Sequence, residues 1–431
     1  MKVAVIGGAG VRTPLLVNGL THSDLPIDQI ALYDTDRQRL SIIGSVAAGM
    51  AARGCVALCE SVADCVGGAD IVFTSIRVGG IARRMQDEAT AQRHGIVGQE
   101  TVGPAGFAMA TRTIPHAVSY AREIGRVAPA AWIINFTNPV GMITEAMRTV
   151  TDRVIGICDT PTELFEEVAH ALGLQSERCA FDYFGLNHLG WLREVYSNGE
   201  PQLHRLWNDA ERLRAVYKLP LFEPSFLRDL KLLPTEYVYY YEQPRRSFEN
   251  VQRAGQTRGQ AIAELTTALF NALGDPNADQ VALYQAYLST RSAGYMQLES
   301  GSAAPAAPSP VSPLSGYDKI ALAVVRAIHN NANAIVPLSV QNRGNIADLL
   351  DNDVIEVPCV VNANGAQPVH VGPVPDRIRP LLTRVREYER RTVQATLVQS
   401  IARARDALAV NPLVPDIATA DRLIADLSPL W

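Results

Sequence analysis

The sequence predicts an α/β protein in which a doubly wound parallel sheet is followed by an α+β domain. Two observations favour this fold class. In the first half, short continuous apolar runs alternate with helical stretches, which is typical of parallel strands covered by helices on both faces. From about residue 190 the pattern changes to long helical stretches with a few strand-like segments. We therefore expect two domains, at residues 1–190 and 191–431.

The expected strands of the N-terminal domain lie at residues 3–6, 30–33, 71–75, 132–136 and 154–158. Two of them are followed by a recognisable helix start. Asn138 precedes Pro139 and is predicted to cap a helix whose first residue is the proline. Thr160 and Glu163 fit a capping box, with a proline between them in the first turn. Strand, polar loop and capped helix together indicate the doubly wound arrangement.

The C-terminal domain is expected to contain helices at residues 225–233, 258–273 and 317–331, and strands at residues 335–341 and 354–362. Residues 301–313 are rich in Ala, Ser and Pro, and this composition predicts a mobile surface loop.

Composition and charge narrow the class of function. The 431 residues are 47% hydrophobic and 19% charged, with a formal net charge of -5 at pH 7. Without a basic block, a nucleic-acid or anionic-membrane partner is not expected. No apolar run is long enough to span a membrane, and the sequence opens on a strand rather than a signal peptide. Six cysteines without a disulfide pattern predict a reduced, cytoplasmic protein that acts on small molecules.

A glycine-rich turn follows the first strand and predicts a dinucleotide site of the Rossmann type. Gly7, Gly8 and Gly10 let the backbone turn tightly and approach a pyrophosphate at the start of the next helix. Asp34 ends the second strand, where its carboxylate would accept a hydrogen bond from a ribose 2′-OH and repel a 2′-phosphate. NAD is therefore the expected cofactor. The alternative is an ordinary glycine turn beside a solvated acid.

Three further strand ends carry side chains that could do chemistry. They are Asn138, in the sequence NFTNPVG, Cys158, in GICDTP, and His188, in GLNHLGW. Cys158 lies beside a predicted helix start, where a thiolate is favoured, so a metal site with His188 is one interpretation. Taken singly, a cysteine and a histidine are more often structural than ligands.

The sequence resembles glycoside hydrolase family 4 over nearly its whole length. The matching stretches are GGAGVRTP, SIRVGG, DEATAQRHGIVGQETVGPAGFAMATRTIP, NFTNPVGMITEA, GICDTP, GLNHLGW, LPTEYVYYY, NRGNIADLLDNDVIEVPCVV, VGPVPDRI, YERRTVQA and NPLV. The long GQETVGPAGF stretch is most similar to the 6-phospho-β-glucosidase branch. The fold implied is a Rossmann domain followed by an α+β domain like that of lactate and malate dehydrogenases.

The resemblance implies a glycosidase mechanism outside the usual scheme of two carboxylates. NAD⁺ would take a hydride from C3 of the sugar, a base would remove the acidified C2 proton, and the aglycone would leave from C1 by elimination. Water would then add and the hydride return. By the same resemblance, Cys158 and His188 hold a divalent ion, typically Mn²⁺, whose sphere the sugar oxygens complete.

The catalytic residues are also carried over from the resemblance. The family's Tyr-x-x-Tyr-Tyr pattern points to Tyr237 as the base, and the alternative is an aromatic packing stripe shared with Tyr240 and Tyr241. Asp159 stands where the α-glycosidase branch has an acid that protonates the leaving group. It could instead be a helix-start residue, so the anomer that is cleaved stays open.

The substrate is expected to be a small glycoside, in most family members a phosphorylated one. Asn138 and Asn187 are the candidates for contacts with sugar hydroxyls. For the phosphate, the available cations are Arg83, Arg84 and Arg258, because a guanidinium binds such an anion with two hydrogen bonds. Arg12 departs from the commoner family sequence in the glycine-rich turn, so an unphosphorylated or otherwise modified sugar is an alternative substrate, and Asp159 leaves an α-linked sugar as another.

Two other classes of function remain as alternatives. An NAD-dependent 2-hydroxyacid dehydrogenase shares the two-domain plan but needs a His–Asp proton relay, which the sequence does not show. A catalytically inactive NAD-binding sensor would not need Cys158, His188 and Tyr237. The family is commonly oligomeric, which implies a homodimer or a homotetramer.

Overall fold

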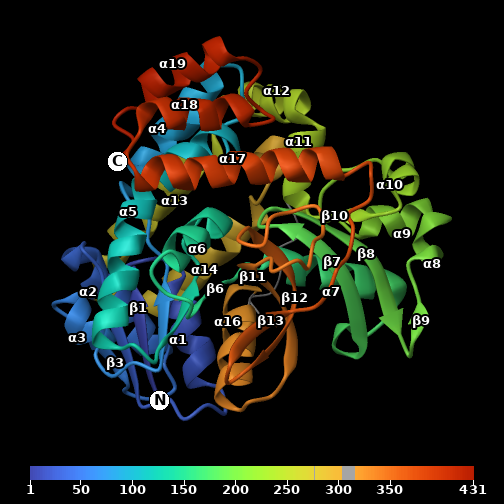
Figure 1. Ribbon diagram of the computed structural model, residues 1–431. Helices are drawn as coiled ribbons and strands as arrows, with labels where there is room; N and C mark the ends of the chain where they lie inside the picture. Colours follow the sequence, from blue (N-terminus) through green and yellow to red (C-terminus); the bar gives the residue numbers. More distant parts are fainter. Residues whose placement is uncertain (276, 303–315) are drawn as a thin grey trace.

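The computed structural model describes residues 1–275, 277–302 and 316–431 (Figure 1). The loop predicted at residues 301–313 lies outside the described residues, apart from its first two positions. In the part of the chain that is described, no helix is both long and apolar enough to cross a bilayer.

Nine of the described strands form one sheet, in the order β13-β12-β11-β6-β5-β4-β1-β2-β3. The N-terminal six pair in parallel, which confirms the predicted doubly wound sheet. They are β1 (Lys2–Ile6), β2 (Gln29–Tyr33), β3 (Val56–Leu58), β4 (Ile71–Thr74), β5 (Trp132–Asn135) and β6 (Val154–Gly156). Strand β3 was not predicted because its short sequence is only half-buried.

Three strands from the C-terminal half extend this sheet. Strand β11 pairs with β6 in antiparallel fashion, and the other two follow it. They are β11 (Ala334–Gln341), β12 (Val354–Asn362) and β13 (Gly365–Pro368). Strands β11 and β12 were predicted as strands. In Figure 1 they lie beside β6, so the two halves of the sequence share one sheet.

A second, smaller sheet was missed by the sequence analysis. It is a hairpin with two short additions, and it crosses the predicted domain boundary at 190/191. Its strands are β7 (Cys179–Leu186), β8 (Leu189–Ser197), β9 (Glu200–Pro201) and β10 (Leu233–Pro234). The turn between β7 and β8 carries Asn187 and His188.

The N-terminal helices alternate with the parallel strands. They are α1 (Thr13–Thr21), α2 (Arg37–Met50), α3 (Val62–Val66), α4 (Gly80–Arg93), α5 (Gly103–Val127), α6 (Val140–Arg148) and α7 (Thr160–Leu172). A 3₁₀ turn at Ser176–Arg178 leads into β7.

The predicted C-terminal helices are confirmed as α10, α13 and α16. The full set is α8 (His204–Trp207), α9 (Ala210–Ala215), α10 (Pro224–Leu230), α11 (Tyr239–Glu242), α12 (Pro244–Ala254), α13 (Arg258–Leu273), α14 (Gln280–Ala293), α15 (Gln297–Ser300), α16 (Gly316–His329), α17 (Arg379–Leu397), α18 (Ile401–Val410) and α19 (Ile417–Leu427), with a 3₁₀ turn at Glu236–Val238. Helix α17 packs across α5 and α6, as Figure 1 shows. Helices α13 and α14 pack together, against α4 and α2 respectively.

Both predicted helix caps were wrong in detail. Helix α6 begins at Val140 with Pro139 as its N-cap residue, and no side chain caps it. The Asn138 Oδ1 atom is buried without a hydrogen-bond partner. Helix α7 begins at Thr160, whose hydroxyl donates to Glu236 Oε1 at 3.2 Å instead of closing a capping box. The Thr160 side chain is thus directed to a tertiary neighbour, and that of Asn138 lies at the cleft, so neither caps its helix.

Candidate active site

A large cleft with a volume of about 1020 Å³ lies at the carboxyl ends of the parallel strands. The structure brings most of the predicted site residues to its walls. They are Gly7, Gly10, Asp34, Arg84, Asn138, Cys158, Asp159, His188, Tyr237 and Arg258. Gly8 and Asn187 do not line it. A cleft in this position is where open α/β sheets bind their ligands.

The glycine-rich turn is built for a close backbone approach. The Gly7 and Gly8 amides both donate to the Tyr33 carbonyl at 2.9 Å, which ties the turn to β2. Gly7 has a φ of 94°, and a Cβ there would lie 2.2 Å from the Ser75 carbonyl oxygen. No side chain caps α1, so the positive end of the helix is available to an anion bound in the turn. The turn fits a pyrophosphate.

Asp34 supports the same turn from the end of β2. Its Oδ2 accepts a hydrogen bond from the Ala9 amide at 3.1 Å, and its Oδ1 accepts one from the Asp36 amide at 3.0 Å. The carboxylate lines the cleft beside the turn, and each oxygen can accept a further hydrogen bond. It therefore fits the ribose-binding role that the sequence predicts.

Cys158 lies just beyond β6, with its thiol buried in the cleft wall. Burial and the nearby carboxylates of Glu356 and Asp159 raise the pKa of this thiol well above its usual value. The adjacent start of α7 thus does not favour the thiolate as the sequence analysis expected, because the acidic surroundings and desolvation outweigh it. A thiolate at this place requires a cation.

His188 occupies the turn between β7 and β8 in the left-handed region, with a φ of 63°. Such a conformation is uncommon for a residue other than glycine, although histidine adopts it more often than most, and strained residues of this kind cluster at active sites. Burial lowers the pKa of His188 to about 4, so its imidazole is neutral at pH 7. Its Nδ1 atom is hydrogen-bonded to the Thr101 hydroxyl at 2.9 Å. A neutral imidazole is the form that binds metals.

Tyr237 stacks on the His188 ring, with the two centroids 3.7 Å apart and the planes 5° from parallel. Burial and the Glu236 carboxylate raise the pKa of Tyr237 well above its usual value. As with Cys158, the ionised form therefore needs a positive charge beside it. The imidazole of His188, the thiol of Cys158 and the phenol of Tyr237 line one cleft, and a divalent ion bound there would favour the thiolate and the phenolate.

The structure describes no cluster of three or more His, Cys, Asp and Glu side chains that could enclose a metal. The predicted pair of Cys158 and His188 would leave a metal site open, so that substrate oxygens could take the other positions.

Asp159 forms an ion pair that the sequence analysis missed. Arg12 Nη1 lies 3.1 Å from Asp159 Oδ2, and the Arg12 guanidinium stands 5.0 Å from the centroid of the Tyr317 ring. This pair joins the end of the glycine-rich turn to the start of α7. The unusual Arg12 in the turn was the available signal, but its partner is 147 residues away.

The two predicted sugar-binding asparagines differ in their surroundings. The Asn138 Oδ1 atom is buried at the cleft without a partner among the described residues, so it is open to a ligand hydroxyl. The Asn187 amide instead donates to Glu356 Oε1 at 3.1 Å, next to the Tyr183 hydroxyl, which donates to the other oxygen at 2.9 Å. Asn187 thus holds the β7–β8 turn against β12.

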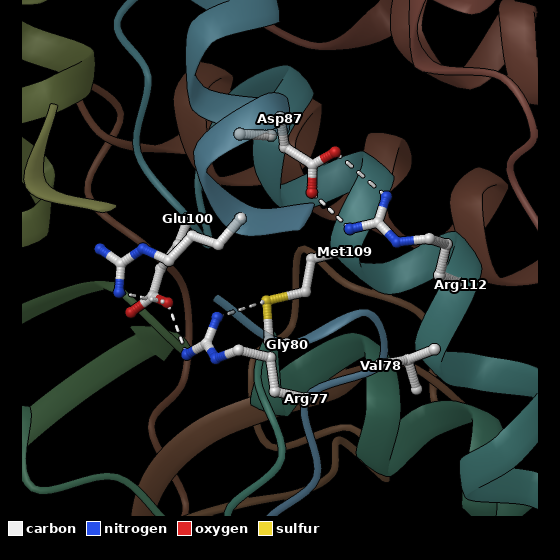
Figure 2. A pocket seen from close by; sticks show the side chains of 9 residues that line it. Arg77, Val78, Gly80, Asp87, Glu100, Met109 and Arg112 are labelled. Carbon is white, nitrogen blue, oxygen red and sulfur yellow. Dashed lines mark hydrogen bonds and ion pairs between the residues drawn. The ribbon is translucent and has the colours of Figure 1, made fainter. Parts of the chain in front are cut away.

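The arginines proposed for a phosphate are also unlike one another. Figure 2 shows Arg77 paired with Glu100, and a second pair, Arg112 with Asp87, above and to the right of them in the view. Arg84 is held in the same cluster, 2.7 Å from Glu88 and 2.8 Å from Glu100. Only about 10 Å³ of space is left between these side chains, so the cluster itself is no ligand site.

Arg83 does not line the cleft. Its guanidinium donates to the Leu427 carbonyl at 2.9 Å, at the C-terminal end of the chain. Arg258 lines the cleft and donates to the Arg291 carbonyl at 2.7 Å. Arg291 was missed: it lines the cleft too, and its guanidinium donates to the Tyr287 hydroxyl at 2.8 Å. Among the described residues, no carboxylate lies within 4 Å of either guanidinium, unlike that of Arg84.

Glu236 is a further residue that sequence reasoning did not find. Burial raises the pKa of Glu236 to about 7. Its Oε1 accepts hydrogen bonds from the hydroxyls of Tyr295 at 3.0 Å and Thr160 at 3.2 Å. Because Glu236 directly precedes Tyr237, its hydrogen bond from Thr160 connects the candidate base to the start of α7.

Fold and cleft together define a dinucleotide-binding α/β enzyme, and comparison with known proteins identifies the class. The chain matches the sequence profile of family 4 glycosyl hydrolases over residues 2–174 and that of their C-terminal domain over residues 183–414. The chain belongs to glycosyl hydrolase family 4, and it is a glycosidase.

Relatives with both anomeric specificities are similar over their full length. A probable 6-phospho-beta-glucosidase of Bacillus subtilis is 29% identical, with 99% of this chain and 95% of the relative covered. The phospho-alpha-glucosidase of Clostridium acetobutylicum is 27% identical, with 99% and 96% covered.

Solved structures confirm the fold. The 6-phospho-beta-glucosidase of Thermotoga maritima, solved with manganese, NAD⁺ and glucose-6-phosphate, superimposes with a TM-score of 0.83 at 27% identity, covering 100% of this chain and 98% of that one. A lactate dehydrogenase from a deep-sea metagenome has a TM-score of 0.55 at 14% identity, covering 92% and 98%. It shares the fold alone, as the sequence analysis expected.

Proposed function

We propose that this glycosidase hydrolyses 6-phosphorylated glucosides with NAD⁺ and a divalent ion, which we expect to be Mn²⁺. The observation that carries the proposal is the meeting of Cys158, His188 and Tyr237 in the same cleft as the glycine-rich turn. The phosphorylated substrates of the relatives, and the ligands bound in the Thermotoga maritima enzyme, support it.

The dinucleotide would lie along the carboxyl ends of β1 and β2. Gly7, Gly8 and Gly10 would admit its pyrophosphate to the start of α1, and Asp34 would accept a hydrogen bond from its ribose. Gly8 does not line the cleft and lets the turn pack closely on β2, because a Cβ there would lie 3.0 Å from Leu32 Cβ. Cys158 and His188 would hold the divalent ion. When bound, the two cofactors supply a hydride acceptor and a Lewis acid.

The side chains around the sugar would then divide the remaining work. Tyr237 would take the proton from C2, and its stacking on His188 fixes the ring relative to the metal ligand. Asp159 would face the leaving group, where its pairing with Arg12 sets the orientation of the carboxylate. Asn138 would donate to or accept from a sugar hydroxyl, and Asn187 would act by fixing the His188 turn.

For the phosphate, we propose that Arg258 binds the anion, assisted by the neighbouring Arg291. Burial lowers the pKa of both guanidinium groups, and for Arg258 it outweighs the nearby Glu299 carboxyl, which raises the pKa. A phosphoryl dianion would supply the missing counter-charge. The charge of Arg84, in contrast, is balanced by Glu88 and Glu100. Arg84 would therefore form part of the wall of the site and would not bind the anion by itself.

The proposal is tested by assaying 4-nitrophenyl α- and β-glucosides, each with and without a 6-phosphate, in the presence of NAD⁺ and Mn²⁺. Turnover of a 6-phosphorylated glucoside only when both cofactors are present is the expected result. Preference for the α anomer would assign Asp159 the role of a general acid. Equal turnover after removal of both cofactors would contradict the proposal.

A second measurement addresses the bond that is broken. In deuterated water, the released sugar should carry deuterium at C2, because Tyr237 removes and replaces that proton. Full retention of C2 protium under complete turnover would exclude this route. Accumulation of NADH with a hydroxy acid would instead favour the dehydrogenase alternative.

We further propose a cytoplasmic homodimer or homotetramer. The described cysteines are all unpaired, which suits a reducing compartment. Apolar side chains are exposed where α17 meets α18, at Leu397, Val398 and Ile401, and they offer an assembly surface. Sedimentation equilibrium measures the assembly, and a monomer at all concentrations would contradict this part.

A further inference from the structure

The motif GQETVGP, which is prominent in the sequence, is not explained by the binding of cofactor or sugar described so far. Its first five residues lie in the loop between α4 and α5 and its last two begin α5, and Gln99 and Thr101 are both buried. Thr101 lies against His188, which comes from the distant β7–β8 turn. The loop therefore contacts the candidate metal ligand through Thr101, while Gln99 and Glu100 of the same loop line the cleft.

The loop is held closely by its neighbours. A Cβ added at Gly98 would lie 2.5 Å from the Glu88 carbonyl oxygen, and one added at Gly106 would lie 2.4 Å from the Thr101 carbonyl. Gly103 has a φ of 64°, which favours glycine. These close approaches to backbone atoms leave Thr101 little freedom to move away from His188.

The direction of each hydrogen bond in the loop can be worked out from the donors. The Gln99 Oε1 atom is approached by the Thr101 amide at 2.7 Å and the Val102 amide at 2.9 Å. Since an amide N–H only donates, this atom of Gln99 acts as the acceptor oxygen. The Thr101 hydroxyl lies 2.8 Å from the same oxygen, so it must donate its single proton there.

The Thr101 hydroxyl oxygen can then only accept from His188 Nδ1, 2.9 Å away. The reverse arrangement, in which the hydroxyl donates to Nδ1, would set the lone pairs of Thr101 and Gln99 against each other. Nδ1 therefore carries the proton of the neutral imidazole, and Nε2 keeps its lone pair.

We propose that Gln99 and Thr101 are positioning residues that fix the tautomer and the ring orientation of His188, so that Nε2 is presented to a divalent ion. The inference rests on the proposed role of His188 as a metal ligand. Partners of this kind orient metal-binding histidines, and their loss typically weakens metal affinity by about 10- to 100-fold. Thr101 contacts neither substrate nor ion in this arrangement.

The test uses the full-length protein in two measurements. The tautomer of His188 is read in the metal-free protein by ¹⁵N NMR of labelled histidines, with His188→Gln assigning the signal among the eight histidines. The affinity for Mn²⁺ is measured by electron paramagnetic resonance of the free ion, without substrate. We expect the Nδ1–H tautomer in the wild type, a mixture in Thr101→Val, and a Kd for Mn²⁺ raised about 10- to 100-fold in that variant.

Two further variants control for structural effects. Thr101→Ser keeps the hydroxyl and should restore both the tautomer and the affinity. Thr113→Val also removes a buried hydroxyl, one whose Oγ1 has no hydrogen-bond partner among the described residues, and should change neither.

The inference is overturned if the wild type shows the Nε2–H tautomer, a result that does not depend on whether any variant folds. It is also overturned if Thr101→Val keeps the wild-type tautomer and Kd. If the wild type binds no Mn²⁺, the metal assignment of the proposed function fails, and the tautomer measurement still decides whether Thr101 sets the state of His188.

Discussion

At the scale of single residues, the cleft contains several titratable groups that burial keeps neutral. Burial raises the pKa of Cys158 and Tyr237 and lowers that of His188. A divalent ion between them would reverse the balance for the thiol and the phenol, since both would gain a nearby positive charge. Substitution of Cys158 or His188 should therefore weaken metal binding, whereas substitution of Tyr237 should impair proton transfer.

The first prediction concerns Cys158→Ser. A serine hydroxyl does not ionise at neutral pH, so the variant should lose Mn²⁺ binding and glycosidase turnover. NAD⁺ binding should stay within a few-fold of the wild type, because the glycine-rich turn lies on β1. Isothermal titration calorimetry with each cofactor checks this. Full activity in the variant would show that Cys158 is not a ligand.

The second prediction concerns Tyr237→Phe. The ring would still stack on His188, but the proton acceptor for C2 would be lost, and the rate should fall about 10²- to 10⁴-fold. Deuterium incorporation at C2 should disappear with it, while the Kd for Mn²⁺ changes little. Tyr196→Phe, at an exposed position of β8, is the matched control. Unchanged exchange at C2 would remove Tyr237 as the base.

At the scale of elements, the site depends on loops that are held by close backbone contacts. The glycine-rich turn is tied to β2 and pressed against the residue that follows β4. The loop between α4 and α5 is locked by contacts at Gly98 and Gly106, and the β7–β8 turn is held through Asn187 to β12. Each loop carries a different part of the site, so a small change in one should affect a particular ligand.

The third prediction follows for the turn between β1 and α1. Gly7→Ala would place a Cβ 2.2 Å from the Ser75 oxygen at a positive φ, so the turn must shift. We expect a destabilisation of at least about 2 kcal/mol and the loss of NAD⁺ binding. Gly54→Ala, where a Cβ meets nothing within 4 Å, should leave both unchanged. Chemical denaturation and NAD⁺ titration of the two variants make the comparison.

At the scale of the whole molecule, ion pairs connect helix α4 to the loops beside the cleft. Glu100 Oε2 forms ion pairs with Arg77 Nη2 at 2.6 Å and with Arg84 Nη1 at 2.8 Å. Burial by itself would raise the pKa of this carboxyl, but the two guanidinium groups lower it well below its usual range. The folded state therefore keeps Glu100 ionised at a pH where the unfolded chain has bound a proton.

The fourth prediction is the resulting dependence of stability on pH. Because the folded pKa of Glu100 lies below the unfolded value of about 4.5, its contribution is complete above that pH and is lost as the pH falls further. Glu100→Gln should be destabilised by about 3 kcal/mol at pH 7, and its difference from the wild type should shrink below about pH 4.5. Glu123→Gln removes an exposed pair with Arg126 and should show little effect at any pH. A pH-independent difference for Glu100→Gln would contradict this assignment.

The strands of the parallel sheet could be predicted because continuous apolar runs of this kind need burial on both faces. The β7–β8 hairpin could not, because its outer half carries charged residues such as Asp182 and Arg193, which satisfy each other only across the hairpin. Among site residues, Cys158, His188 and Tyr237 were reached through a family resemblance rather than through local physics. Glu236 and Thr101 lie in stretches that carried the resemblance, but their roles depend on partners that the sequence does not show, and nothing in its local sequence marks Arg291.

The amino-acid sequence by itself determined the alternation of strands and helices, the glycine-rich turn and the membership of a glycosidase family, because these depend on local periodicity and ordered motifs. The tertiary structure alone decided that Asp159 pairs with Arg12 and that Thr101 faces His188. It also decided that Arg84 is ion-paired with carboxylates, whereas Arg258 and Arg291 form no ion pair among the described residues. Charge and hydrogen bonding act over a few ångströms, and only folding brings residues from distant parts of the chain within that range.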